Sequence, residues 1–307
     1  MIRSRRIDPA ALDRWLAENL SGKLGASYVH RLLEERKTAR GSVWDGLSGY
    51  VEEAHEDARR NLRAALGPTL APFAKPEDDP AFGYPGDLHH STLMGYFGEV
   101  LAGLVAEHKT LHGKRAWAVP AFLFRFHQVA FQKLDARRDL RQQGLDPEPV
   151  DAEGAKVTGR TGNDMLAFLP GPDGELAALL VCEAKCFVSH NATKASAAHH
   201  QLAGVPRSRC PSGVRELIEI LNDYDTKEAK EWCERLRRYY CNPSLRPPRH
   251  DVLLYATGDA PKDPARKTWL ATDKPDAKYG SKGPLEVVEI HLSDPADLVR
   301  TLYRHTR

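Results

Sequence analysis

The chain has 307 residues, of which 41% are hydrophobic and 28% charged, so it is long enough to bury a sizeable core and its composition is not that of a disordered protein. Lys and Arg total 44 against 42 Asp and Glu, and this formal charge of +2 excludes a chain-wide field that attracts polyanions. The absence of a long apolar stretch or signal-like start, and an odd set of five cysteines, lead us to expect a cytoplasmic protein with reduced thiols.

The chain is expected to begin with a helix that ends near Gly22. Asp8 precedes Pro9, a pair that suits a helix start because the aspartate accepts free backbone N–H groups and the proline already has a helical φ angle. Apolar residues then recur at helical spacing, and these are Leu12, Trp15, Leu16 and Leu20.

A second helix is predicted from about Trp44 to Leu66, ended by Gly67 and Pro68. The stretch 68–85 is rich in proline and acidic residues, which is typical of a linker, although such a connection can also pack on the surface of a single domain. We therefore divide the chain into a helical N-terminal region, residues 1–85, and a second domain, residues 86–307.

The second domain is expected to alternate helices and strands. Apolar spacing predicts a buried helix over 91–108, whereas the apolar run 120–134 fits a strand or a helix. Residues 163–169 and 175–187 are apolar runs joined by Pro170–Gly174, which predicts a β-hairpin. Further helices are expected at 193–202, 212–222, 226–240 and 295–304, and strands at 251–257 and 285–292. These elements predict an α/β or α+β fold, with a central mixed sheet flanked by helices.

The second strand of the hairpin carries two charged residues within an apolar run. Strand alternation places Glu183 and Lys185 on one face together with Leu179, Val181 and Phe187. The other face carries Leu180, Cys182, Ala184 and Cys186. Desolvating a carboxylate and an ammonium ion is costly without a partner or a function, so this pair indicates a site.

A second carboxylate enters the same sheet from the neighbouring strand. Asp164 precedes the apolar residues 165–168, so it is expected to lie near Glu183 once the hairpin forms. Hard divalent cations prefer oxygen ligands, and Mg²⁺ commonly binds one or two carboxylates while it keeps several waters. The pair therefore predicts a magnesium site.

Together, Asn163-Asp164 and Glu183-Ala184-Lys185 resemble the D-(x)n-E-x-K signature of the PD-(D/E)XK nuclease superfamily. The resemblance implies a restriction-endonuclease-like fold and phosphodiester hydrolysis. It implies that Asp164, Glu183 and the Ala184 carbonyl bind Mg²⁺ or Mn²⁺ and that Lys185 orients the attacking water. In this chain Asn163 replaces the proline of the signature, which makes the match less specific.

The resemblance extends to two further residues. Many members of the superfamily add a carboxylate from the helix before the sheet, and Glu99 holds that place as a catalytic and metal-binding candidate. A helix often follows the signature lysine, and there Gln201 is the candidate for a supporting residue behind the metal ligands. The match covers roughly residues 91–202.

Structural alternatives exist for each of these residues. Glu183 and Lys185 could form a simple salt bridge on a half-exposed sheet face, with Asp164 in a turn, and Glu99 could be a surface residue of its helix. The pairs His89-His90 and His199-His200 could bind a transition metal, but adjacent histidines on one helix point in different directions. The spacing of Cys182 and Cys186 on a strand is too long for one zinc ion.

A cluster of arginines and aromatic residues late in the chain is the best sequence candidate for nucleic-acid contacts, through phosphates and stacked bases. Its members are Arg235, Arg237, Arg238, Arg246, Arg249, Tyr239 and Tyr240. A solvated helix face explains the same pattern, because Glu228, Glu231 and Glu234 balance much of the charge.

The expectation for function is a Mg²⁺-dependent nuclease, with DNA a better match than RNA as substrate, in restriction or anti-phage defence. The chain has no GxxxxGK[ST] loop, so an ATP-driven step would need a partner ATPase or helicase. A homodimer would supply two active sites for a double-strand cut. The alternatives are a non-catalytic nucleic-acid-binding or protein-interaction module with the same fold, and a metal hydrolase that uses His199 or His200.

Overall fold

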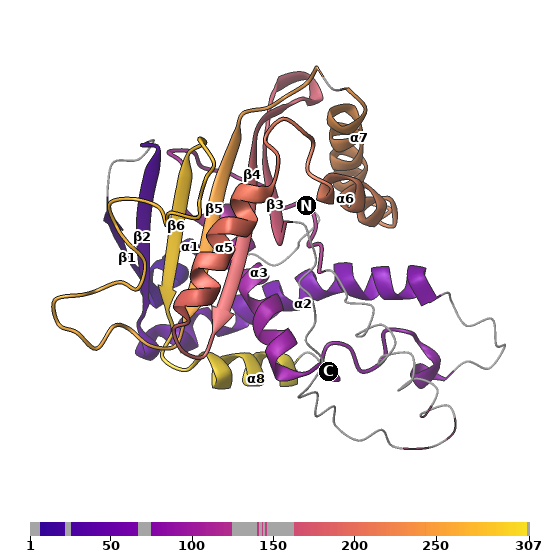
Figure 1. The fold of residues 1–307 in the computed structure, drawn as a ribbon. Helices are drawn as coiled ribbons and strands as arrows, with labels where there is room; N and C mark the ends of the chain where they lie inside the picture. Colours follow the sequence, from indigo (N-terminus) through magenta and orange to yellow (C-terminus); the bar gives the residue numbers. More distant parts are fainter. Residues whose placement is uncertain are drawn as a thin grey trace.

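The computed structural model describes residues 7–21, 26–66, 75–124, 140, 143, 145, 163–242 and 244–305. Its centre is a six-stranded mixed sheet with helices on both faces (Figure 1). Across the sheet the strand order is β1-β2-β6-β5-β4-β3. The strands are β1 Leu16–Ser21, β2 Tyr28–Glu35, β3 Met165–Pro170, β4 Leu176–Phe187, β5 Arg249–Thr257 and β6 Leu285–His291.

The four inner strands run in the same direction. β2, β6, β5 and β4 pair in parallel, and β1 and β3 pair antiparallel to them at the two edges. The carboxyl ends of the parallel strands therefore meet at one edge of the sheet. In this register Lys185 lies beside Tyr255, and Tyr255 lies beside Glu289.

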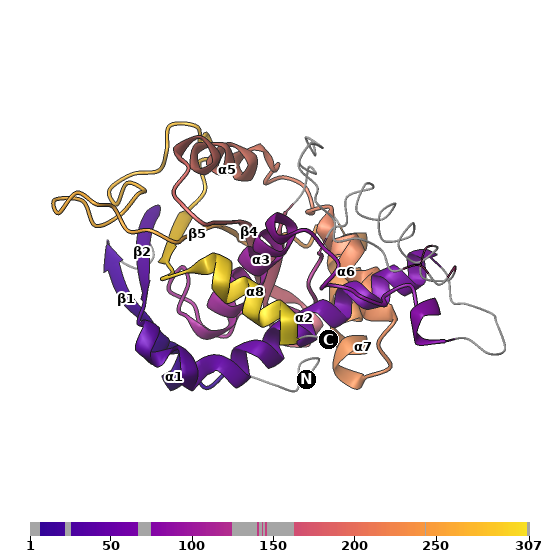
Figure 2. The ribbon, with the colours of Figure 1, turned by 90° about the horizontal axis from the view of Figure 1, so that it is seen from below.

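The helices form one layer on each face of the sheet (Figures 1 and 2). One face packs against α2, α3 and α8, with α1 at its margin, and the other packs against α5, α6 and α7. The helices are α1 Pro9–Trp15, α2 Arg40–Leu66, α3 His90–His108, α5 Ala192–Gly204, α6 Gly213–Asn222, α7 Lys227–Cys241 and α8 Pro295–His305. Short 3-10 turns lie at η1 Lys37–Ala39, η2 Pro76–Asp78 and η3 Pro172–Gly174.

Strand β4 divides these two layers as its alternation predicts. Cys182 and Ala184 belong to the core under α3, whereas Leu179 and Val181 belong to the core under α5, α6 and α7. Gly98 allows α3 to approach β4 closely, because a Cβ there would lie 3.2 Å from the Cys186 Cβ. Glu183 and Lys185 consequently project from the face opposite to α3.

The prediction of a wholly helical N-terminal region is wrong. Asp8 does cap α1, accepting the N–H groups of Ala10 and Ala11, but the helix ends at Trp15 and the chain continues as β1. Leu16 continues the apolar face of α1 and also pairs with Glu35 across the β1–β2 ladder. This pairing to a distant strand overrides the local helical periodicity.

The N-terminal elements belong to the same sheet and core as the rest of the described chain. β2 pairs with β6, and α2 contributes Leu47 and Val51 to the core that also contains Val288 and Ile290. The second predicted helix is confirmed, with an earlier start at Arg40.

The remaining predicted elements are confirmed to within a few residues: the helix at 91–108, the hairpin, the three following helices, both late strands and the last helix. Residues 120–124 form neither a helix nor a regular strand, and residues 125–139 lie outside the described residues. In the part of the chain that is described, no helix is both long and apolar enough to cross a membrane.

Candidate active site on the β3–β4 hairpin

The hairpin brings Asp164 next to the backbone of β4. The Asp164 N–H donates to the Cys182 carbonyl at 3.1 Å, which extends the ladder by one residue beyond the start of β3. The next outward-pointing amide on β4, that of Ala184, donates to Asp164 Oδ2 at 2.8 Å. A side chain thus replaces the strand partner at this position, and this fixes the carboxylate at the end of the ladder.

The Lys185 ammonium group lies where three oxygen-bearing groups converge. Its Nζ donates to Glu183 Oε1 at 2.5 Å, to the Ala184 carbonyl at 3.1 Å and to Asp164 Oδ2 at 3.3 Å. The predicted proximity of Asp164, Glu183 and Lys185 is therefore confirmed as a structural arrangement. Glu183 and Lys185 do form the salt bridge of the structural alternative. Its face is more buried than that alternative expects, because Glu183 is 4% exposed and the side chains of Lys185 and Asp164 are each 25% exposed.

The electrostatics of the cluster follow from this burial. Burial, and then the neighbouring Asp164 carboxylate, raise the pKa of Glu183 to about 8. Burial on its own would lower the pKa of Lys185, but the Asp164 and Glu183 carboxylates raise it above its usual value. The site therefore favours a cation between its two carboxylates, and the ammonium group of Lys185 fills that role.

The donor atoms fit a hard divalent cation. Asp164, Glu183 and the Ala184 carbonyl all offer oxygen, which Mg²⁺ and Mn²⁺ prefer, and none offers sulfur or nitrogen. No three His, Cys, Asp or Glu side chains are grouped as a metal site among the described residues. The candidate ligand set thus consists of two carboxylates and one backbone carbonyl.

Glu99 and Gln201 do not join this cluster. Glu99 is on α3, which packs on the opposite face of β4. The pKa of Tyr303 is raised by burial and then by the charge of Glu99, which places that carboxylate near α8. On α5, Gln201 is exposed, and His199 is the residue that turns into the sheet.

The histidine and cysteine alternatives also lack a metal-binding arrangement. His199 is buried and bonds through Nδ1 to the Ala195 carbonyl at 3.0 Å, whereas His200 is exposed, so the two rings point in different directions as predicted. His89 caps α3 by accepting the Ser91 N–H. Cys182 and Cys186 are buried free thiols whose pKa values are raised by burial.

Beside Lys185, the same sheet face carries a second polar cluster that the sequence did not reveal. The Tyr255 hydroxyl accepts the Asn191 N–H at 2.9 Å and bonds to His190 Nδ1 at 3.0 Å. The His190 ring stacks on Trp269 with a centroid separation of 4.2 Å and an interplanar angle of 3°. Together with Lys185, these side chains form a row across the sheet that leads away from Asp164 and Glu183.

This row ends at Glu289, a buried carboxylate with four hydrogen-bond donors. They are His30 Nε2 at 3.1 Å, His291 Nε2 at 2.7 Å, the Trp269 N–H at 2.7 Å and the Leu270 N–H at 3.0 Å. Burial would raise the pKa of Glu289, but these hydrogen bonds lower it to about 2. The sequence did carry a signal for Glu289, a charged residue within an apolar strand, and the same signal indicated Glu183.

The predicted arginine cluster lies at the far end of β4. Arg238 donates to the Asp173 carbonyl in the hairpin turn, so α7 packs beside the start of β4. Leu176 and Lys185 are nine steps apart on an extended strand, about 30 Å. The structure therefore separates this cluster from the candidate active site.

Most members of the arginine cluster are engaged within the protein. Arg249 is buried and pairs with Asp251 at 2.7 Å, and Tyr239 is also buried, so neither is available for the predicted nucleic-acid contact. Arg237 donates to Asn222, and Arg235 lies over the Trp232 ring.

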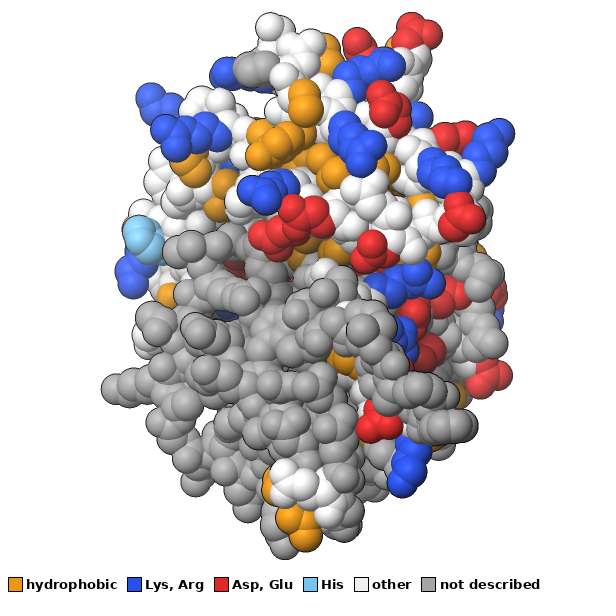
Figure 3. Space-filling view, turned by 90° about the vertical axis from the view of Figure 1, so that its right-hand side faces the viewer, with side chains coloured by type: hydrophobic (Ala, Val, Ile, Leu, Met, Phe, Trp, Pro, Cys, Tyr) orange, Lys and Arg blue, Asp and Glu red, His pale blue; other side chains and the backbone are white. Residues whose placement is uncertain are grey.

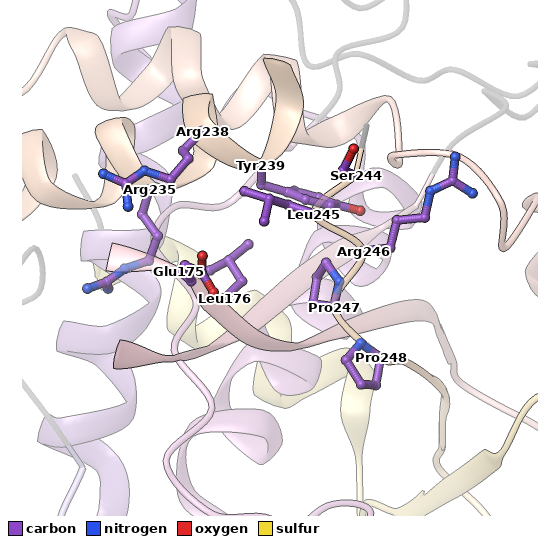
Figure 4. A pocket seen from close by; sticks show the side chains of 10 residues that line it. All are labelled: Glu175, Leu176, Arg235, Arg238, Tyr239, Ser244, Leu245, Arg246, Pro247 and Pro248. Atoms are coloured by element: carbon purple, nitrogen blue, oxygen red, sulfur yellow. The ribbon is translucent and has the colours of Figure 1, made fainter. Parts of the chain in front are cut away.

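Tyr240 is 45% exposed. Arg235 and Arg238 line a hollow beside Glu175, and Arg246 points away from them (Figure 4). Basic and acidic side chains are interleaved on the face that carries α6 and α7 (Figure 3). This surface therefore has the mixed charge of a solvated helix face.

No family model matches the chain, and a comparison with the curated proteins finds no match.

Proposed function

We propose that this protein is a metal-dependent nuclease that hydrolyses phosphodiester bonds at the Asp164–Glu183–Lys185 cluster. The supporting observation is that two carboxylates, one backbone carbonyl and one ammonium group converge at the end of the β3–β4 ladder. The proposal includes a restriction-endonuclease-like arrangement of the sheet. Magnesium or manganese as the metal, DNA as the substrate and a role in restriction or anti-phage defence rest on the signature resemblance.

Asp164, Glu183 and the Ala184 carbonyl are the groups that would hold the metal. When bound, such an ion polarises the phosphate and lowers the pKa of a water molecule. The Ala184 N–H keeps Asp164 in place through the 2.8 Å hydrogen bond. Lys185 is close enough to both carboxylates to hold a water or a phosphate oxygen beside them and to offset negative charge that develops there.

One observation favours a second function, a non-catalytic nucleic-acid-binding module. Lys185 already contacts both carboxylates, so the cluster is an internally satisfied ion-pair network. A satisfied network of this kind needs no chemistry to account for it, because removing one partner would leave an uncompensated buried charge. Dependence on a divalent cation separates the two functions.

The test is cleavage of plasmid and single-stranded DNA by the full chain with Mg²⁺ or Mn²⁺, compared with EDTA. Wild type is compared with Glu183→Gln and Lys185→Met, and with Glu175→Gln as a matched control. Glu175 is an exposed glutamate at the other end of the hairpin, so its change removes the same charge without touching the cluster.

The nuclease proposal expects metal-dependent cutting by wild type and by Glu175→Gln, and a loss of about 100- to 1,000-fold in the other two variants. It also expects both inactive variants to remain folded by circular dichroism. Wild-type protein that binds DNA with no cutting under either metal would overturn the proposal in favour of the binding module.

A further inference from the structure

The connection between β5 and β6, residues 258–284, is a long segment without a helix or strand. Loops longer than about 12–15 residues that lack secondary structure are uncommon in compact domains and are often functional. The segment leaves β5 after Thr257, which pairs with Phe187 at the same end of the sheet as Lys185. In Figure 1 it is the long orange loop that extends beyond the sheet. Its start therefore lies at the edge that carries the candidate active site.

Glu289 fixes the middle of this segment to the sheet. Its carboxylate accepts the backbone N–H groups of Trp269 and Leu270. Farther along, the Tyr28 hydroxyl donates to the Ala271 carbonyl at 2.6 Å. These bonds hold the loop firmly at the level of Lys185, because Lys185, Tyr255 and Glu289 are neighbours across the sheet.

The segment also contacts the turn that follows the candidate active site. The Trp269 ring stacks on His190, and His190 bonds to the Tyr255 hydroxyl. His190 precedes α5 and follows β4, which carries Lys185. The Trp269 part of the loop is thus linked through side-chain contacts to Tyr255, the strand neighbour of Lys185.

The segment carries a net positive charge, and most of its basic side chains are not paired with a described carboxylate. The segment contains six basic residues, Lys262, Arg266, Lys267, Lys274, Lys278 and Lys282. It contains four acidic residues, Asp259, Asp263, Asp273 and Asp276. All five lysines are exposed, and none forms a salt bridge with any residue that the structure describes. On α7, by contrast, Lys227 and Lys230 pair with Glu231 and Asp225.

We propose that segment 258–284 is the surface on which this protein binds the phosphate backbone of nucleic acid. The exposed Lys262, Lys267 and Lys274 supply the phosphate contacts, and Glu289, Trp269 and His190 hold this part of the segment at the edge of the sheet that carries the candidate active site. Lys278 and Lys282 lie toward the opposite edge, where the Tyr279 hydroxyl donates to Asp251 at the start of β5. The proposal rests on the proposed nuclease function only in its claim that bound nucleic acid lies beside an active site. The binding surface itself is testable without cleavage.

The test measures the affinity of a fluorescein-labelled DNA duplex in EDTA, at several salt concentrations, in the Glu183→Gln background so that cutting plays no part. One variant carries Lys262→Gln, Lys267→Gln and Lys274→Gln. The matched control carries Lys227→Gln, Lys230→Gln and Arg237→Gln on α7, which removes the same charge from the other end of the molecule.

If three phosphate contacts are lost, the slope of log Kobs against log salt becomes shallower by about 2.7 in the loop variant, at about 0.9 per contact. The control variant is expected to keep the slope of the Glu183→Gln protein. A loop variant with an unchanged slope, or an equal change in both variants, would overturn the proposal. So would the absence of DNA binding by the Glu183→Gln protein at low salt.

Cleavage by the parent chain, without Glu183→Gln, is measured separately. Metal-dependent cutting together with an unchanged slope in the loop variant would refute this surface and leave the nuclease function standing. A reduced slope in the loop variant without any cutting would support the surface and refute the nuclease function.

Discussion

Lys185 Nζ lies 3.3 Å from Asp164 Oδ2, although the two residues are 21 positions apart in the chain. The same Oδ2 atom accepts the Ala184 N–H at 2.8 Å. Asp164 therefore has two separable roles, as a negative charge and as the acceptor that completes the backbone ladder. Two substitutions at this position distinguish them.

Asp164→Asn keeps an amide oxygen for the Ala184 N–H, whereas Asp164→Ala leaves that N–H without its acceptor. We expect Asp164→Ala to lower the free energy of unfolding by about 1–3 kcal/mol, the cost of a lost hydrogen bond to a partly buried donor. Asp164→Asn is expected to stay closer to wild type, and both are expected to lose metal-dependent cleavage. Urea denaturation with the two variants side by side checks the ranking, and equal stability would contradict the backbone role.

The Glu289 anchor predicts a local effect on the 258–284 segment. The Trp269 N–H donates to Oε1 and the Leu270 N–H to Oε2, so Glu289→Gln, which retains a single acceptor oxygen, leaves at least one of these two amides without its hydrogen bond. We expect at least one of the two amides to exchange with deuterium faster. The buried partners left unpaired are expected to cost about 3–5 kcal/mol of stability.

Glu234→Gln on the outer side of α7 is the control, because Glu234 is exposed. It is expected to leave exchange in the segment unchanged. Slow exchange of both Trp269 and Leu270 in Glu289→Gln would show that other contacts hold the loop.

The packing of α3 predicts opposite effects for two of its glycines. A Cβ at Gly103 would lie 2.4 Å from Phe122 Cζ, so Gly103→Ala overpacks the core and is expected to cost about 1–3 kcal/mol. At Gly95 no atom lies within 4 Å of the added Cβ. Gly95→Ala is expected to stabilise the helix by about 0.5–1 kcal/mol. Chemical denaturation of both variants measures this, and a destabilising Gly95→Ala would contradict the open environment of that position.

Local sequence patterns predict much of this structure because they act over short distances. The alternation of β4 places Glu183 and Lys185 on one face, and the turn 170–174 brings Asp164 beside them. No long-range information is needed for these features. The helices from α2 onward follow from apolar spacing in the same way.

The features that the sequence did not reveal depend on contacts between distant segments. Glu289 bonds to His30 across 259 positions, and β1 forms because it pairs with β2. Arg249 looks like a surface arginine until its pairing with Asp251 and its burial are known. The roles of such residues depend on which strands become neighbours, and composition and periodicity do not encode that choice.

The last prediction concerns stability at mildly acidic pH. The rings of His112 and His250 lie 4.8 Å apart, and Trp117 packs edge-on against His250. Burial lowers the pKa of His112 to about 4, and burial followed by the charge of His112 lowers the pKa of His250 to about 4.

Between the usual histidine pKa of about 6.5 and about 4, the unfolded chain therefore binds more protons than the native chain at these two residues. Their contribution to stability is present above about pH 6.5 and is lost as the pH falls toward 4. His250→Gln removes one of these groups. The slope of unfolding free energy against pH should therefore be smaller in this range, by up to the amount that corresponds to one bound proton. Urea denaturation of wild type and His250→Gln from pH 7 to pH 4 gives the two slopes. Parallel slopes would mean that His250 keeps an ordinary pKa in the native protein, which would contradict the effect of burial described here.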